Sequence, residues 1–176
     1  MIKIAVDSMG SDNSPFSEVE GAVLAAKAYD VSVILVGKEN ILAPLLREAG
    51  GEGLPIEIRN ATQVIAMDEI PTIALRKKKD SSIRVAAELV RDKVASGLVS
   101  AGNTGAVMAT AKMVFGAVPG VDRPALAAIL PTLTGHAVLL DVGANVTCKP
   151  RHLVQLRLWD IFSARKSSES LRRVWG

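Results

Sequence analysis

Cysteine and aromatic residues are scarce in this 176-residue chain. The single Cys148 excludes an internal disulfide, which favours a reducing compartment such as the cytoplasm. Aromatic residues make up 3% of the chain. No apolar run approaches the roughly 18 residues expected of a membrane-spanning helix. The first apolar run is broken by Asp7, which is not the pattern of a secretory signal. We therefore expect a cytoplasmic protein.

Several familiar ligand motifs are missing as well. The chain has neither the G-x-G-x-x-G dinucleotide fingerprint nor the G-x-x-x-x-G-K-[ST] phosphate loop. Its two histidines, His136 and His152, form no zinc pattern, and no Ser-His-Asp order can be recognised. Asp7, Asp12 and Asp141 could in principle hold Mg²⁺, but capping and hydrogen bonding are the favoured roles. We therefore predict no metal site.

Basic charge is concentrated at one end of the chain. The net charge is +3, yet residues 151–176 carry six Lys and Arg against two acidic residues, which leaves residues 1–150 near −1. Both tryptophans also lie in this last segment, so the composition changes there. A nucleic-acid surface needs basic residues spread over a folded face, and we therefore predict no nucleic-acid partner.

Short apolar runs alternate with helical patterns along the chain. The runs predict strands at residues 2–6, 31–36, 55–59, 98–99, 125–130 and 137–140. Helices are expected around residues 19–26, 41–48, 75–79, 81–94, 108–115 and 152–156. This alternation predicts an α/β fold with three layers, an open sheet between helices on both faces. Only six residues separate the last two strands, too few for a parallel crossover, so these should be antiparallel and the sheet mixed.

Three corners rich in glycine and small polar residues each follow a predicted strand. They are Asp7–Asp12, Ser100–Gly105 and Asp141–Asn145. Ligands of open α/β sheets bind beyond the carboxyl ends of the strands, where such corners would lie together. Ordinary turns favour the same residues, so one corner alone indicates little. Three of them in equivalent positions predict a shared ligand site.

The segment from Ser100 to Ala106 reads as a strand-to-helix turn. Gly102 and Gly105 allow a tight bend and leave no Cβ in the way of a ligand. Asn103 or Thr104 can cap the following helix. The first amides of that helix lack partners and carry partial positive charge, which suits a phosphate or a carboxylate. The alternative is a capped helix with glycines for the bend.

Two basic features admit both a functional and an ordinary interpretation. Arg123 could clamp a phosphate bidentately, or it could pair with the neighbouring Asp122 or stay solvated. The run Lys77–Lys79 is more typical of a solvated face, and if it is functional it would suit an acidic protein partner.

Together these segments resemble the bacterial phosphate acyltransferases of phospholipid synthesis. The similarity runs from residue 2 to about residue 156, in the order and at the spacing of that family. Ser8 and Ser11 replace the usual Ala and Gly, a mild departure. The matching segments are Asp7–Asp12, Arg76–Ser82, Ser100–Ala106, Asp122–Leu126, Asp141–Asn145 and Cys148–Pro150.

The resemblance implies a reaction and an assembly. Such enzymes move a long acyl group from acyl carrier protein to inorganic phosphate, and the acyl phosphate then feeds glycerol-3-phosphate acyltransferase. The resemblance also implies a phosphotransacetylase-like or isopropylmalate-dehydrogenase-like fold, a homodimer at the inner membrane face, and no dissociable cofactor.

The resemblance also suggests roles for the three corners. Asn103 and Thr104 would donate to the phosphate at the helix N-terminus, and Asn145 and the amides near Gly143 would face the thioester oxygen. Asp7 and Asp12 would shape their loop. The predicted catalytic residues are Asn103, Thr104 and Asn145. The predicted phosphate- and substrate-binding residues are Asp7, Gly10, Asp12, Ser100, Gly102, Gly105, Arg123, Asp141 and Gly143.

The chain departs from the family near its end. Family members are much longer, and the likeness stops at about residue 156. We therefore expect an incomplete acyltransferase domain over residues 1–156 and an unrelated, frameshifted basic tail over residues 157–176, with doubtful activity for the chain as given. The alternatives are a short-chain phosphotransacetylase that uses acetyl-coenzyme A and a non-catalytic phosphate- or nucleotide-binding module.

Overall fold

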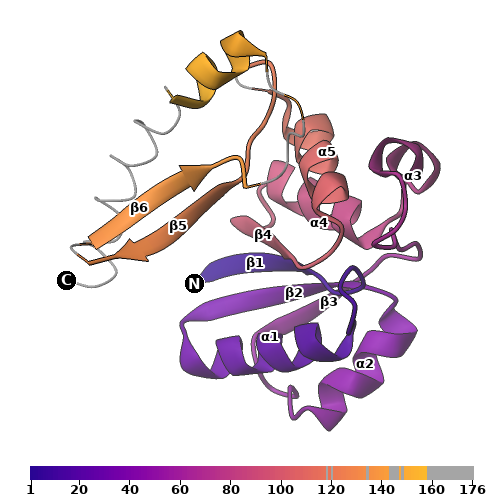
Figure 1. Cartoon of the computed structure of the whole chain (residues 1–176). Helices are drawn as coiled ribbons and strands as arrows, with labels where there is room; N and C mark the ends of the chain where they lie inside the picture. The colour runs from indigo at the N-terminus through magenta and orange to yellow at the C-terminus, as the bar shows by residue number, and fades with distance from the viewer. Residues whose placement is uncertain (118, 120, 134, 143–146, 148, 158–176) are drawn as a thin grey trace. The chain divides into compact units, whose positions relative to one another are not determined.

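The computed structural model describes the whole chain except residues 118, 120, 134, 143–146, 148 and 158–176 (Figure 1). The chain forms two compact units, Met1–Gly116 and Ala117–Gly176. The predicted tail from residue 157 lies almost entirely outside the described residues, so its boundary stays a prediction. In the described part of the chain, the helices lack the combination of length and apolar character that crossing a bilayer requires.

The first unit is built on a four-stranded parallel sheet with the order β3-β2-β1-β4. Its elements are β1 (Ile2–Asp7), α1 (Phe16–Ala28), β2 (Val31–Gly37), α2 (Glu39–Glu48), β3 (Ile56–Asn60), α3 (Pro71–Lys77), α4 (Ser82–Arg91), β4 (Gly97–Ser100) and α5 (Thr104–Phe115). The register places Asp7 of β1 opposite Val36 of β2 and Ser100 of β4. The central strand therefore ends beside the ends of both neighbours.

Both faces of this sheet are covered by helices. On one face, Leu35 of β2 packs with Val19 of α1 and Leu42 of α2. On the other, Val36 packs with Leu89 of α4. Figure 1 shows α1 and α2 below the strands and α4 and α5 above them. Because successive side chains of a strand point to opposite faces, the continuous apolar run of β2 serves both cores. The predicted three-layer α/β arrangement is confirmed.

The second unit contains a hairpin and a helix. Strands β5 (Ala127–Thr132) and β6 (Gly135–Leu140) pair in antiparallel fashion, as the short connection predicts. They form a two-stranded sheet of their own, so the parallel and antiparallel parts of the expected mixed sheet are divided between two sheets. The short connection pairs each strand with its neighbour in sequence. Residues 150–157 are helical, with Pro150 in the first turn, where its missing N–H is not needed.

Two of the helix boundaries that differ from the sequence prediction have a local cause. Helix α3 begins at Pro71 instead of Leu75, because Ile70 is extended and the proline ring presets a helical φ for the first turn. Helix α4 ends at Arg91, earlier than predicted, because Lys93 takes a left-handed conformation with φ of 61°. The N–H of Val94 then donates to the carbonyl of Leu89, which closes the helix end.

Replacing Lys93 with glycine is expected to stabilise the first unit. A side chain with a Cβ is strained in the left-handed region, whereas glycine adopts it freely and is the usual residue after a helix end. We expect the free energy of unfolding to rise by about 0.5–1 kcal/mol in urea titrations. Lys93→Ala keeps the Cβ and is the control; an equal gain in that variant would point to removal of the lysine charge instead.

Candidate functional site

Two of the three predicted corners meet at the carboxyl ends of β1 and β4. The Ser100 hydroxyl donates to Oδ2 of Asp7 at 2.8 Å and accepts from the N–H of Gly102 at 3.2 Å. Asp7 is only 2% exposed. Its other carboxylate oxygen, Oδ1, has no hydrogen-bond partner within the described part of the chain. A buried acceptor without a partner is unusual and is typical of a site that awaits a ligand or water.

The two corners also touch through their glycines. A Cβ built on Gly102 would lie 3.2 Å from the Cα and the carbonyl oxygen of Gly10. A Cβ built on Gly10 would lie 2.7 Å from Oδ2 of Asp7 and 3.1 Å from the Cα of Gly102. Both positions therefore need glycine because backbone meets backbone there. The expectation that these corners lie together is confirmed for this pair.

A groove of about 460 Å³ opens beside Asp7 and Ser100. Ser17 and Glu18 of α1 complete its polar end, and Oε2 of Glu18 is likewise buried without a partner in the described chain. Neither α1 residue was predicted from the sequence. The only signal for them was their position next to the apolar side of α1. The apolar walls include Ile4, Val6, Ala22, Ala25, Val33 and Val99. The groove thus joins an apolar surface to the acidic end of β1.

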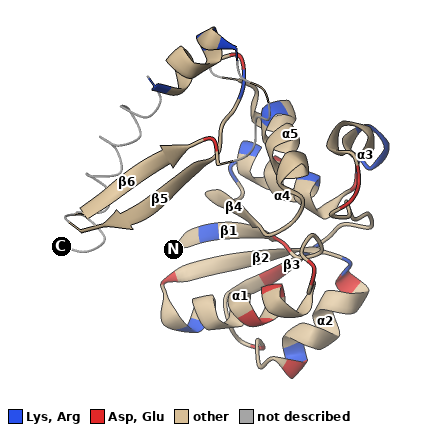
Figure 2. Cartoon of the chain, in the orientation of Figure 1, with Lys and Arg blue, Asp and Glu red and all other residues tan. Residues whose placement is uncertain are grey.

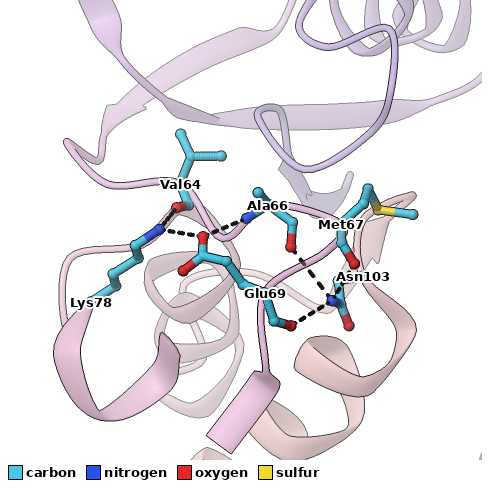
Figure 3. Close-up of polar contacts among 6 residues, drawn as sticks. All are labelled: Val64, Ala66, Met67, Glu69, Lys78 and Asn103. Carbon is cyan, nitrogen blue, oxygen red and sulfur yellow. Dashed lines mark hydrogen bonds and ion pairs between the residues drawn. The ribbon is translucent and has the colours of Figure 1, made fainter. Parts of the chain in front are cut away.

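Asn103 caps α5, as predicted, and its amide group also has a second task. Its Oδ1 accepts from the N–H of Ala106 at 3.0 Å, which satisfies one free amide of the first turn. Its Nδ2 donates to the carbonyls of Met67 at 2.8 Å and Glu69 at 3.1 Å, with Ala66 at 3.4 Å (Figure 3). Both amide hydrogens are therefore used to hold the loop before α3. Donation to a phosphate, the role suggested from the sequence, would require breaking these bonds.

The same loop is held from its other side by an ion pair. The Lys78 ammonium donates to Oε1 of Glu69 and to the carbonyl of Val64 at 2.6 Å (Figure 3). The N–H of Ala66 donates to the same Glu69 oxygen at 2.8 Å. These contacts, with the Ala66 N–H as the largest cause and Lys78 next, lower the pKa of Glu69. We call the contacts of Asn103, Glu69 and Lys78 with the loop the latch.

Because of the latch, we expect the free energy of unfolding to fall at acidic pH. Because the pKa of Glu69 is lowered by folding, its contribution is present at neutral pH and is lost as the pH falls below the ordinary glutamate pKa. In urea titrations from neutral pH to about pH 3, Glu69→Gln should be less stable at neutral pH and should lose less on acidification. The pKa of Asp80 is also lowered, by the Thr62 hydroxyl and N–H. The stability of the variant should therefore still depend on pH in part. Parallel profiles for variant and parent would contradict the prediction.

The remaining predicted residues of the first unit lie around this centre. Thr104 is exposed at the first position of α5, and Asp12 is exposed in its turn. Gly105 packs against α3, since a Cβ there would lie 2.8 Å from Cγ of Pro71. The need for glycine at this position therefore comes from helix packing, which the sequence did not indicate.

The third corner belongs to the second unit. Asp141 has a left-handed φ of 64°, and its N–H donates to the carbonyl of Leu126 at 2.6 Å. Gly143 and Asn145 lie outside the described residues. Whether this corner completes the site formed by the other two stays a prediction.

Arg123 also lies in the second unit and is exposed. Its guanidinium donates to the carbonyl of Thr147 at 3.2 Å. The neighbouring Asp122, the alternative partner considered for Arg123, pairs with Arg151 at 3.1 Å. A carbonyl partner leaves other donors of the guanidinium able to bind an anion.

Comparison with known proteins identifies relatives over most of the chain. The model of the family described as "Fatty acid synthesis protein" matches residues 2–170, which extends past the predicted boundary at residue 156. Proteins named phosphate acyltransferase are similar to this chain in many bacteria. That of Acidobacterium capsulatum is 55% identical over 93% of this chain and 49% of its own length. That of Koribacter versatilis is 56% identical over 89% of this chain and 44% of its own length.

A third relative gives the same proportions. The phosphate acyltransferase of Pelotomaculum thermopropionicum is 50% identical over 94% of this chain and 48% of its own length. The chain thus spans about half the length of the curated relatives it matches. Since the family model covers nearly all of the chain, including both corners that meet at Asp7 and Ser100, the protein belongs to the fatty acid synthesis protein family.

Proposed function

We propose that this chain takes part in transferring a long acyl group from acyl carrier protein to inorganic phosphate, as an acyltransferase of phospholipid synthesis. The observation that carries the proposal is the meeting of the Gly10 and Gly102 backbones at the N-terminus of α5. Glycine corners at a helix N-terminus leave amides open to an anion. High identity to proteins named phosphate acyltransferase supports phosphate as that anion and an acyl group as the second substrate.

The chemistry requires a phosphate held in place near a thioester carbonyl. A phosphate oxygen attacks the carbonyl carbon, the new C–O bond forms, the C–S bond breaks, and the carrier thiolate leaves and takes up a proton. Orientation alone accounts for much of the acceleration in such a step, so no covalent enzyme intermediate is needed. The N–H groups of Thr104 and Gly105, in the first turn of α5, would bind the phosphate.

Asp7 and Asn103 would then support the phosphate site in different ways. The unpartnered Oδ1 of Asp7 can accept a hydrogen bond from a protonated phosphate oxygen. Asn103 would act as a positioning residue, because its amide holds the loop at 66–69 against α5. Asn145 and the amide of Gly143 remain the proposed donors to the thioester oxygen, whose negative charge grows in the transition state.

The groove beside Asp7 supports the acyl half of the proposal. Its walls are apolar, and it reaches the same end of β1 as the glycine corners. A long hydrocarbon chain gains about 0.8 kcal/mol for each buried CH₂ group. This favours a long acyl substrate over the acetyl group of a short-chain phosphotransacetylase.

The proposed cellular setting follows the family. We expect the complete enzyme to work as a homodimer on the cytoplasmic side, in peripheral contact with the inner membrane, and without a dissociable cofactor. Its product would pass to a glycerol-3-phosphate acyltransferase.

A second candidate is phosphate binding without turnover. It is favoured by one finding, that the chain spans about half the length of its curated relatives. The relatives have residues beyond this span that could contribute to their catalysis, whereas the α5 N-terminus is already present here.

The test combines turnover with binding on the 176-residue chain. The chain is incubated with hexadecanoyl carrier protein and phosphate, and acyl phosphate is trapped with hydroxylamine. Calorimetry measures phosphate binding in parallel. Trapped product supports acyl transfer, and the same yield from acetyl-coenzyme A would favour the short-chain activity. Binding without product supports the second candidate. Neither binding nor product would overturn both.

A further inference from the structure

Helix α3 and the loop before it present a surface that is both basic and apolar. Figure 2 shows the ribbon at the end of α3 in blue, the colour of Lys and Arg. We call the following exposed residues the α3 surface: Met67, Ile70, Ile73, Arg76, Lys77 and Lys79.

The latch holds one cation of the run Arg76–Lys79 inward and leaves the others exposed. Lys78 is half-buried and occupied by Glu69 and the Val64 carbonyl. Arg76, Lys77 and Lys79 are exposed, and the described part of the chain holds no ion pair for them. Three positive charges are therefore left for a partner, since internal pairing uses only one of the four.

Apolar side chains lie beside these charges. Ile70 is 62% exposed and Ile73 is 48% exposed, whereas Ala74 and Leu75 form the buried side of α3. Ile73 stands three and four positions before Arg76 and Lys77, which places all three on one side of the helix. An exposed apolar strip bordered by charges of one sign is typical of a protein-binding surface.

The α3 surface is fixed next to the proposed phosphate site. Pro71, at the start of α3, packs against Gly105 in the first turn of α5. Asn103 ties the loop at 66–69 to the same turn. A partner bound on the α3 surface would therefore sit beside the place where phosphate is proposed to bind.

We propose that the α3 surface docks an acidic protein that presents carboxylates around an apolar patch, and this rests on the proposed function, in which the acyl donor is a carrier protein. Opposite charges steer such a partner and set its orientation, and the isoleucines are buried once it has docked. The partner delivers its thioester next to the N-terminus of α5.

The test measures binding of hexadecanoyl carrier protein to the 176-residue chain by fluorescence anisotropy. A triple variant, Arg76→Glu, Lys77→Glu and Lys79→Glu, should weaken binding by at least about tenfold. A control variant with the same change of net charge carries Lys27→Glu, Arg47→Glu and Arg59→Glu, all exposed on α1, α2 and β3. The control should stay within about twofold of the parent.

Further arms separate the effect of charge from those of apolar contact and misfolding. Parent affinity should fall as salt rises from about 50 to 300 mM, and Ile73→Ser should weaken binding without changing the salt slope. Thermal unfolding must show that each variant is folded. Equal loss in both triple variants, parent-like binding by the α3 variant, or absence of binding by the parent would overturn the proposal. Binding of each variant to anionic phospholipid vesicles is measured as well. If the α3 triple variant lost vesicle binding but kept carrier-protein binding, the proposal would also be overturned.

The readout does not require turnover. Carrier binding that depends on the α3 surface would stand even if no acyl phosphate were formed. In that case only the proposed function would fail.

Discussion

Replacing Asn103 with alanine should destabilise the first unit by about 2 kcal/mol and abolish measurable phosphate binding. The change removes the cap of α5 and the amide that binds the carbonyls of Met67 and Glu69. The loop at 66–69 then keeps only the contacts made by Glu69 and Lys78 among those of the latch. Because that loop lies against the first turn of α5, its release should also disturb the amides proposed to receive phosphate. Urea unfolding and calorimetry with phosphate measure the two effects.

Asn103→Ser separates the two tasks of this side chain. Serine supplies a capping oxygen but is too short to reach the carbonyls of the loop. We expect the serine variant to recover about 1 kcal/mol of stability relative to alanine while phosphate binding stays weak. If serine restored binding as well, the cap alone would suffice and the tether would have no role.

Replacing Gly10 with alanine should disrupt the meeting of the two glycine corners. The added Cβ would lie 2.7 Å from Oδ2 of Asp7 and 3.1 Å from the Cα of Gly102. A backbone atom cannot move aside as a flexible side chain can, so the loops must separate. We expect a loss of about 1–3 kcal/mol in unfolding free energy, together with loss of phosphate binding.

Gly21→Ala is the matched control for that variant. It introduces the same methyl group in the middle of α1, where nothing lies within 4 Å of the new atom. Alanine should stabilise the helix there by about 0.5–1 kcal/mol and leave phosphate binding unchanged. If both alanine variants had the same effect, steric contact between the corners could not be the cause.

The sequence was sufficient for the parallel strands of the first unit and for the meeting of two of the three predicted corners. Continuous apolar runs such as β2 mark buried parallel strands, and a polar residue such as Asp7 marks where such a strand ends. Since neighbouring parallel strands end at one edge, Asp7 and Ser100 could be expected to meet, as they do. The cap by Asn103 also followed from local chemistry.

The latch could not be predicted because its parts are joined only by tertiary folding. The loop between β3 and α3 has no hydrophobic period, so nothing indicated that its carbonyls face Asn103. Lys78 belongs to an apparently uniform basic run. It alone turns inward, because its ammonium group pairs with the Glu69 carboxylate. The start of α3 at Pro71 could have been predicted from the preference of proline for a first helical turn.

The position of β1 in the sheet also affects how the chain is made. Its two neighbours leave the ribosome at very different times, because Ser100 follows Asp7 by 93 residues whereas β2 comes soon after. At about 5–20 residues per second, synthesis leaves one side of the N-terminal strand unpaired for roughly 5–20 seconds. During that interval the nascent chain exposes an apolar strand edge, the kind of segment that chaperones bind.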